Sequence, residues 1–210
     1  MQFHNLQKNG GYTIIETMVS ISIFLVVVMY GMAALLNANV VQRKLQDMHS
    51  IIDNMSFIME DISRNLRTGY NIKCFQKNVD TILSTATISA SPTTRSCTDG
   101  WAIAFEPTFG HPSSYTDQWV YYLDSSGKLW KSTQGVVAGS SIQLTPDEVV
   151  IDQISGFSVL GAVPVALGDS QQPMVTIRLS GNITYKPGTP NSIVSPFSLQ
   201  TSVSQRAIDI

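Results

Sequence analysis

The uncharged run from Thr17 to Leu36 constrains this chain more than any other feature of its sequence. The run contains 20 apolar or small residues and no Asp, Glu, Lys or Arg. As a helix rising about 1.5 Å per residue it is roughly 30 Å long, which matches the hydrocarbon thickness of a bilayer. A cleavable secretory signal has a shorter apolar region that is followed by small residues, whereas Gly10 and Gly11 precede this run. The run therefore predicts a membrane-spanning helix.

Charge is scarce along the whole chain. Only 13% of its 210 residues are Asp, Glu, Lys or Arg, and the formal net charge is −2. The mean hydropathy is +0.10 and the sequence pI is near 5.8. This composition argues against a disordered chain and against a nucleic-acid-binding protein that relies on a basic surface.

A second helical pattern follows the apolar run without interruption. Eight apolar residues recur at alternating spacings of four and three, as in an amphipathic helix: Val41, Leu45, Met48, Ile52, Met55, Met59, Ile62 and Leu66. Gly69 supplies a stop after Arg67, a cation that suits the end of a helix. The pattern predicts one helix from Tyr12 to Thr68. We expect the stripe to pack on the chain's own globular part; a coiled coil is the alternative, because the spacing is heptad-like.

The composition changes after Gly69. Residues 69–210 contain all nine prolines and many Ser and Thr residues, with short apolar alternations that are typical of a β-rich head. Seven strands are predicted, at Trp101–Phe105, Trp119–Leu123, Lys128–Ser132, Val149–Gln153, Gly156–Leu160, Met174–Ser180 and Phe197–Val203. Asp124 to Gly127 is a turn signal for a hairpin between the second and third of these strands. Residues 84–98 and 186–196 are predicted to be loops.

Aromatic side chains gather in the middle of the predicted head. Successive residues of a strand point to opposite faces, so one of Tyr121 and Tyr122 is expected outside. We expect core and cross-strand pairing for these side chains, and contact with another subunit or with cargo is the alternative.

The junction before the apolar run carries a motif. Residues 8–16 read Lys-Asn-Gly-Gly-Tyr-Thr-Ile-Ile-Glu, a polar leader with glycine, an aromatic residue and an acid ahead of an apolar helix. This combination resembles the processing site of type IV prepilins and of related pseudopilins. The resemblance implies cleavage after Gly11 by a prepilin peptidase, methylation of Tyr12 as the new N-terminus, and a role for Glu16 in assembly. Tyr12 stands where most of the family has Phe.

Glu16 lies at the edge of the predicted span, where a carboxylate is costly and usually has a partner. Cleavage after Gly11 creates a free α-amine on Tyr12, four residues before Glu16. The carboxylate can meet the amine of its own helix or that of a neighbouring subunit, and the resemblance implies the second pairing, which sets the register between subunits. A lone glutamate at the lipid headgroups of an ordinary anchor is the alternative.

The C-terminal end shows a second resemblance. A strand-like segment at 172–181 is followed by a loop and then by Phe-Ser-Leu-Gln-Thr-Ser-Val-Ser-Gln-Arg at 197–206. This ending is similar to that of minor pilins, of the J type in type II secretion and of the W type in type IV pili. Four residues match the Thr-x-Val-Ser-x-Arg pattern of those proteins: Thr201, Val203, Ser204 and Arg206. Ala207 stands where Asn is usual. The resemblance implies a minor subunit near the tip of a filament.

The two cysteines, Cys74 and Cys97, both fall in the predicted head. Outside the cytoplasm a disulfide between them is permitted, and it would stabilise the head by about 3 kcal/mol in the chain-entropy model. Two buried free thiols are the alternative. Because a pilin-like head leaves the membrane, we expect the disulfide.

The sequence contains no recognisable catalytic or metal-ligating motif. Three histidines are scattered, without Cys or His at metal-ligand spacing: His4, His49 and His111. Three acids beside one predicted strand carry the oxygen ligands that calcium prefers, although we expect a solvated strand edge: Asp147, Glu148 and Asp152. We therefore expect a structural protein that is not an enzyme, with no cofactor, no metal and no nucleic-acid partner.

These observations predict an α+β protein with a leader peptide over 1–11, a transmembrane or filament-core helix over 12–36, an amphipathic extension over 37–68 and a β-rich head over 69–210. The resemblance implies a pilin-like fold and a minor pilin or pseudopilin, cut after Gly11. Its implied partners are other subunits, contacted through the N-terminal helix, the prepilin peptidase, an inner-membrane assembly platform, and membrane lipid before assembly. A single-pass anchored β domain that binds a surface ligand without assembling is the alternative function.

The resemblance also implies an orientation. The chain would cross the bacterial inner membrane once, with the head outside the cytoplasm and later in a pilus or pseudopilus. The positive-inside rule mildly opposes this orientation, because Lys8 precedes the span whereas Arg43 and Lys44 follow it. We follow the motif, since the prepilin peptidase acts on the cytoplasmic face.

Overall fold

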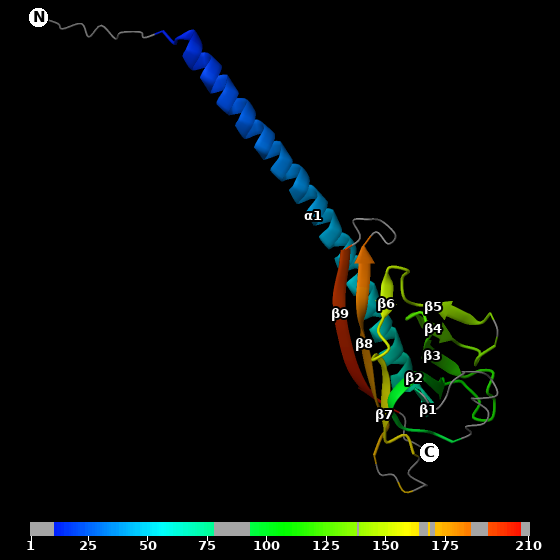
Figure 1. The fold of residues 1–210 in the computed structure, drawn as a ribbon. Coiled ribbons are helices and arrows are strands. Elements are labelled where there is room, and N and C mark those ends of the chain that lie inside the picture. Colours follow the sequence, from blue (N-terminus) through cyan, green and yellow to red (C-terminus); the bar gives the residue numbers. More distant parts are fainter. Residues whose placement is uncertain are drawn as a thin grey trace, which may run out of the picture. The chain divides into compact units, whose positions relative to one another are not determined.

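The computed structural model describes residues 11–77, 93–137, 139–163, 168, 171–185 and 193–206. The chain has an α+β layout, in which helix α1 (Ile14–Thr68) is followed by an antiparallel sheet (Figure 1). It divides into two compact units, Met1–Asp47 and Met48–Ile210, and the division falls within α1. The second unit contains the last part of α1 and the whole sheet.

Helix α1 begins two residues later than predicted and ends at the predicted residue. The N–H of Gly69 donates to the carbonyl of Asn65 at 2.9 Å, which satisfies a carbonyl of the last turn. A side chain at residue 69 has no room, because a Cβ there would lie 2.3 Å from Cδ2 of Phe105. Gly69 therefore both ends the helix and lets the sheet approach it.

The amphipathic stripe is buried only in its second half. Four of the predicted residues belong to the core: Met55, Met59, Ile62 and Leu66. Ile58, which the heptad spacing omits, is buried beside them. By contrast, 54% of Val41, 50% of Leu45 and 38% of Ile52 are exposed. The expectation that the stripe packs on the head is therefore confirmed from Met55 to Leu66, whereas Ile52, in the same unit, stays partly exposed.

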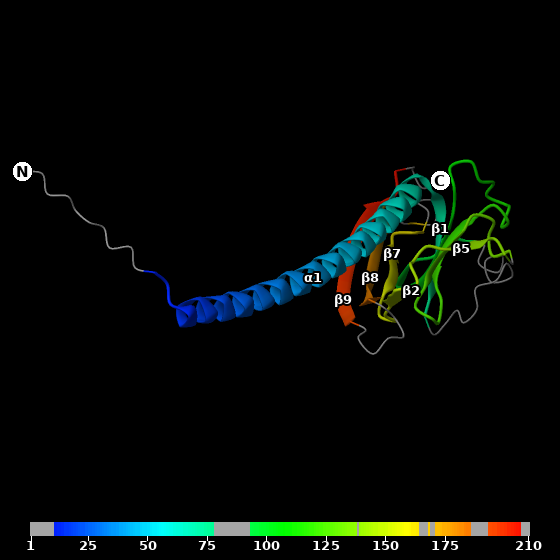
Figure 2. The same ribbon diagram turned by 90° about the horizontal axis from the view of Figure 1, so that it is seen from above.

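In the part of the chain that the structure describes, nine strands form one antiparallel sheet. They are β1 (Tyr70–Gln76), β2 (Cys97–Glu106), β3 (Trp119–Leu123), β4 (Leu129–Ser132), β5 (Ser141–Gln143), β6 (Val149–Ile151), β7 (Gly156–Leu160), β8 (Met174–Tyr185) and β9 (Ile193–Ser204). The hydrogen-bonded order is β5-β4-β3-β2-β7-β8-β6, with β1 on β2 and β9 on β8. The sheet curves into a half-barrel against the last part of α1, as the two views show (Figure 1, Figure 2).

All seven predicted strands are present, although several bounds differ. Trp119–Leu123 and Gly156–Leu160 are confirmed at both ends. The predicted loop over 84–98 is wrong from Cys97, where β2 starts, and its part over 84–92 lies outside the described residues. The sequence patterns do not predict β1, because four consecutive residues of this strand are buried and no alternation results: Ile72, Lys73, Cys74 and Phe75. They also miss β5, which has only three residues.

The predicted loop over 186–196 is wrong from residue 193, where β9 begins. Pro196 lies within this strand and pairs with Asn182 of β8. Proline is tolerated in an edge strand, where its missing N–H need not serve the sheet. Residues 186–192 lie outside the described residues.

The predicted hairpin between β3 and β4 is confirmed. One carboxylate oxygen of Asp124 accepts the N–H groups of Ser126 at 2.9 Å and Lys128 at 2.8 Å. Gly127 has a φ of 73°, in the left-handed region that favours glycine. These contacts fix the turn, as expected for an Asp that bonds the backbone after it.

The main core lies between α1 and the concave face of the sheet. A smaller apolar cluster lies on the opposite face of the sheet: Phe75, Ala102, Ala104 and Val120. Tyr121 is fully buried in the main core, whereas the ring of Tyr122 packs on the smaller cluster and stacks on Trp130 at 6.4 Å between centroids. The two tyrosines therefore point to opposite faces, as predicted, and both take part in packing.

Candidate functional site

The junction predicted to be cut lies outside regular secondary structure. Gly11 and Tyr12 precede α1, and 82% of Tyr12 is exposed. A Cβ placed on Gly11 would meet no atom within 4 Å. Exposed, irregular backbone of this kind is the preferred substrate of peptidases. The arrangement is thus accessible to cleavage between residues 11 and 12.

Thr13 caps the start of α1, a role that the sequence analysis missed. Its Oγ1 accepts the N–H of Glu16 at 3.3 Å, and its carbonyl accepts the N–H of Thr17 at 3.2 Å. Thr-x-x-Glu is the sequence signal of a capping box, in which the threonine serves the N–H three residues later. Thr13 therefore fixes where the helix begins.

Glu16 occupies the first turn of α1 and is exposed. A negative charge there is favoured by the helix dipole, by about 0.3–1 kcal/mol at an exposed site. No described residue forms an ion pair with it. Its exposed carboxylate is thus accessible from outside the helix.

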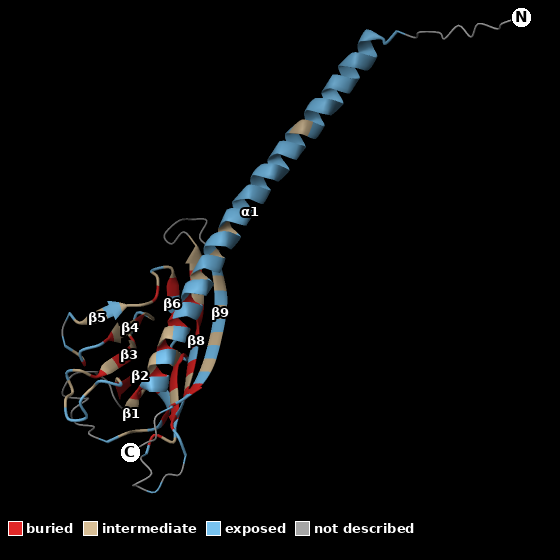
Figure 3. Cartoon of the chain, turned by 180° about the vertical axis from the view of Figure 1, so that it is seen from behind, coloured by how far each residue is buried: buried red, intermediate tan, exposed pale blue. Residues whose placement is uncertain are grey.

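Apolar side chains surround α1 on every side between Ile14 and Leu36. Fifteen of them are between 52% and 79% exposed: Ile14, Ile15, Met18, Val19, Ile21, Ile23, Phe24, Leu25, Val26, Val27, Met29, Tyr30, Met32, Leu35 and Leu36. Figure 3 shows this part of the helix almost entirely in the exposed colour. A window of 18 residues here has a mean hydropathy of 2.5 and is 0% buried. The helix is long and apolar enough to span a membrane.

Two hydroxyl groups within this segment are satisfied by the helix itself. Thr17 donates to the carbonyl of Ile14 at 2.8 Å, and Ser22 donates to the carbonyl of Met18 at 2.8 Å. Such back-bonding removes the need for a polar partner in an apolar environment. Both residues are therefore compatible with lipid or with a bundle of apolar helices.

Cys74 of β1 and Cys97 of β2 form a disulfide in the structure, with 5.7 Å between their Cα atoms. Both residues are buried in the main core. Gly100 lies directly against the bridge, because a Cβ there would be 2.4 Å from Sγ of Cys74 and 2.7 Å from Sγ of Cys97. Glycine at residue 100 leaves the space that the disulfide occupies.

The C-terminal motif begins on β9, and Arg206, which follows the strand, contacts the end of α1. Val203 is buried in the core, and the N–H of Arg206 donates to the carbonyl of Arg67 at 2.8 Å. The hydroxyl of Thr108 donates to the carbonyl of Thr68 at 3.0 Å. Two carbonyls that a helix end leaves without internal partners are thereby satisfied. The motif thus has a structural role in the head.

A buried polar cluster, for which no sequence pattern is a signal, lies on the outer face of β1 and β2. Oε1 of Glu106 accepts a hydrogen bond from Nε2 of Gln118 at 2.5 Å. Nζ of Lys73 lies 5.0 Å from the ring centroid of Tyr115. Burial raises the pKa of Glu106, which the hydrogen bond from Gln118 opposes in part. Burial also lowers the pKa of Lys73, although the charge of Glu106 opposes this shift.

Among the described residues, no group of three or more His, Cys, Asp or Glu can hold a metal ion. One of the three acids considered for calcium, Asp147, instead accepts a hydrogen bond at Oδ1 from Gln143 at 3.1 Å. Its backbone carbonyl accepts another from Lys128 at 3.0 Å. Asp147 lies in the turn before β6, where these two side chains contact it.

The residues predicted for cleavage and assembly thus lie together in the structure, with the exposed junction at Gly11 and the carboxylate of Glu16 directly before the apolar surface of α1. Comparison of the whole chain with models of protein families, with curated proteins and with solved structures finds no match.

Proposed function

We propose that this chain is a minor pilin or pseudopilin of a type IV pilus or a type II secretion pseudopilus. In this proposal a prepilin peptidase cuts the chain after Gly11 in the bacterial inner membrane and methylates Tyr12. An assembly platform in that membrane then moves the helix into a filament. The chain is a structural subunit and not an enzyme.

One arrangement carries the proposal. An exposed Gly11–Tyr12 junction, the acid Glu16 in the first helical turn and an uncovered apolar surface follow one another at the same end of α1. An anchor that only holds a protein in the membrane needs the apolar surface alone. The cleavable junction and the acid have a use when the helix must be released and aligned with others.

The proposed mechanism exchanges lipid for protein around the helix. In a bundle of apolar helices the dielectric is low, so the carboxylate of Glu16 attracts the α-amine of a neighbouring Tyr12 more strongly than in water. An unpaired carboxylate in the same place is strongly unfavourable. Only registers that bring the two groups together are then stable, which aligns the subunits.

Two further features support this function. A disulfide in the head suits a domain that lies outside the cytoplasm. The C-terminal pattern from Thr201 to Arg206 favours a minor subunit of the J or W type, near the filament tip.

The role of Glu16 can be tested with one variant that removes its charge and a control variant at the cap of the same helix that keeps it. In cells that assemble the filament, Glu16→Gln keeps the size of the side chain and removes its charge. We expect normal cleavage and about tenfold or greater loss of the chain from sheared filaments, because the charge-assisted pair is absent. Thr13→Ala weakens the helix cap and keeps the carboxylate, so its incorporation should stay near that of the unaltered chain.

Equal incorporation of Glu16→Gln and the unaltered chain would refute the role in register. Absence of the unaltered chain from filaments that are otherwise complete would favour the anchored β domain that binds a ligand without assembling. Equal losses in the two variants would assign Glu16 to helix capping instead.

A further inference from the structure

Strand β9 forms one edge of the sheet. It pairs with β8 through 12 residues in a register without a shift, and no described strand pairs with its other side. The length is unusual for an edge, because edge strands are generally kept short. A row of backbone groups on β9 therefore faces away from the sheet.

The direction of these groups follows from the pairing. The N–H of Gln205 donates to the carbonyl of Pro173 at 3.0 Å, so odd-numbered residues of β9 bond toward β8. Pro196, which has no N–H to give, falls among the even-numbered residues and agrees with this assignment. By alternation, Ser198, Gln200 and Ser202 direct their N–H and carbonyl groups outward.

This edge carries few of the devices that usually prevent pairing with another strand. Such devices are charged side chains, prolines and bulges. Residues 193–204 contain no charged residue, and the one proline lies near the start of the strand. From Phe197 to Ser204 the edge is regular and uncharged. It is open to an added strand.

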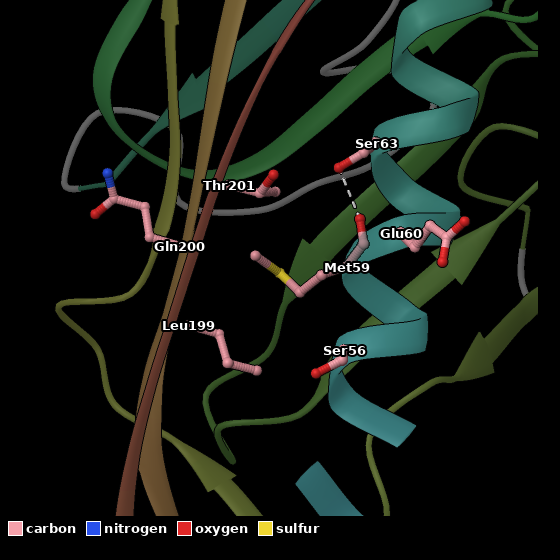
Figure 4. Close-up of a pocket in the computed structure, with 7 residues that line it drawn as sticks. All are labelled: Ser56, Met59, Glu60, Ser63, Leu199, Gln200 and Thr201. Carbon is pink, nitrogen blue, oxygen red and sulfur yellow. Dashed lines mark hydrogen bonds between the residues drawn. The ribbon is translucent and has the colours of Figure 1, made fainter. Parts of the chain in front are cut away.

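A groove of about 320 Å³ runs between this edge and α1. Its lining comes from two elements, with Ser56, Met59, Glu60 and Ser63 on α1 and Leu199, Gln200 and Thr201 on β9. Figure 4 shows Met59 and Leu199 directed toward the space between helix and strand, and Gln200 directed away from it. A strand added to β9 would continue the half-barrel and cover this groove.

We propose that the outer edge of β9 binds an extended strand of another protein. The strand would pair with the backbone of Ser198, Gln200 and Ser202, and alternate side chains would enter the groove over Met59. Backbone pairing of this kind gives affinity, and the pockets for alternate side chains give specificity. The proposal does not depend on cleavage or filament assembly.

The groove defines the chemistry of the bound strand. Met59 and Leu199 offer apolar contact, so the inward side chains should be aliphatic or small. Glu60 lines the groove and pairs with Arg64 at 3.0 Å, so the lining carries no unpaired charge that a charged inward side chain could neutralise. The partner is thus a β-prone segment without charged residues on its inward face.

A peptide copy of β8, residues 174–183, serves as the probe. It has no acidic residue, and its alternate Val175, Ile177 and Leu179 are apolar. Binding of the labelled peptide to the full chain in detergent micelles is measured by fluorescence anisotropy. Gln200→Pro removes one outward N–H and leaves the pairing with β8 intact, as Pro196 does. Gln200→Thr changes the same side chain and keeps the N–H.

We expect the peptide to bind the unaltered chain and Gln200→Thr equally, and to bind Gln200→Pro at least about tenfold more weakly. A peptide methylated on alternate backbone nitrogens should not bind the unaltered chain, which tests the proposal even if Gln200→Pro does not fold. Absence of binding to the unaltered chain would overturn the proposal. Equal binding to Gln200→Pro and to the unaltered chain would also overturn the proposal. The peptide would then bind without the outward N–H of residue 200, in the place of β8. A dimer of the purified chain that Gln200→Pro abolishes would show a second copy as the occupant and contradict the proposed partner.

Discussion

Nζ of Lys131 on β4 lies 2.9 Å from Oδ2 of Asp61 on α1. The same carboxylate oxygen accepts a hydrogen bond from the hydroxyl of Tyr121 at 3.2 Å, and that hydroxyl accepts one from Asn65 at 2.8 Å. The ammonium group also lies 4.7 Å from the ring centroid of Trp119. These contacts join the last part of α1, which belongs to the second unit, to β3 and β4 of the sheet.

Replacement of Asp61 by Asn should lower the free energy of unfolding by about 1 kcal/mol at pH 7, since the pair is partly exposed. Burial alone would raise the pKa of Asp61, but the hydrogen bond and charge of Lys131 hold it below its usual value. A lowered pKa in the folded state gives stability that is present above the unfolded pKa of 3.8 and is lost as the pH falls through the folded value. Denaturant unfolding at several pH values should therefore show the variant and the parent chain converging in acid.

Glu60→Gln is the matched control for this prediction. Glu60 also pairs with a cation, Arg64, but their side chains are 67% and 73% exposed. Its replacement should change stability by less than about 0.5 kcal/mol. A larger effect at Glu60 than at Asp61 would contradict the importance given to the Lys131 contact.

Replacement of both cysteines by Ala should lower the free energy of unfolding by about 3 kcal/mol, because Cys74 and Cys97 close a loop in the unfolded chain. Chemical denaturation of the oxidised protein and of the variant gives this difference. An unchanged midpoint would mean that the disulfide adds no stability to the head.

Gly100→Ala should destabilise the oxidised head by about 1–3 kcal/mol, because its Cβ would overlap both sulfur atoms. The same substitution in the chain that lacks both cysteines should cost clearly less. A double-mutant cycle on unfolding free energies measures this coupling. Equal effects in the two backgrounds would show that the disulfide is not what excludes a side chain at residue 100.

Glu106→Gln should stabilise the head at neutral and alkaline pH. Burial raises the pKa of Glu106 in the folded state, so its contribution to stability is full below the unfolded pKa and is lost as the pH rises through the folded value. The variant has no such loss, and its advantage over the parent chain should grow from pH 4 to pH 8. Parallel stability curves over this range would contradict the buried state of the carboxyl group.

The sequence predicts which helices and strands form better than it predicts which of their residues are buried. The long helix and its end at Gly69 followed from hydrophobic spacing and one glycine, which act locally. The full burial of Met55 but not of Ile52 depends on where the sheet lies, and spacing along one helix contains no such information. Strand β1 escaped prediction because its residues are buried on both faces, so the alternation of a half-buried strand is absent.

The candidate site was predictable only in part for the same reason. Gly11, Tyr12 and Glu16 are close in sequence, and their spacing on the start of one helix could be read directly. The cap at Thr13 has a local sequence signal, Thr-x-x-Glu, and is predictable in the same way. Long-range pairs such as Lys131 with Asp61, and the free edge of β9, depend on the topology of the sheet and have no local signal.

The mass of the mature protein tests the central claim most directly. The chain is purified from cells that contain an active prepilin peptidase, and intact-mass and N-terminal peptide measurements are made. The account predicts loss of residues 1–11 and one added methyl group on the α-amine of Tyr12, with Gly11→Leu remaining uncut. A protein that keeps Met1 in those cells would contradict the account.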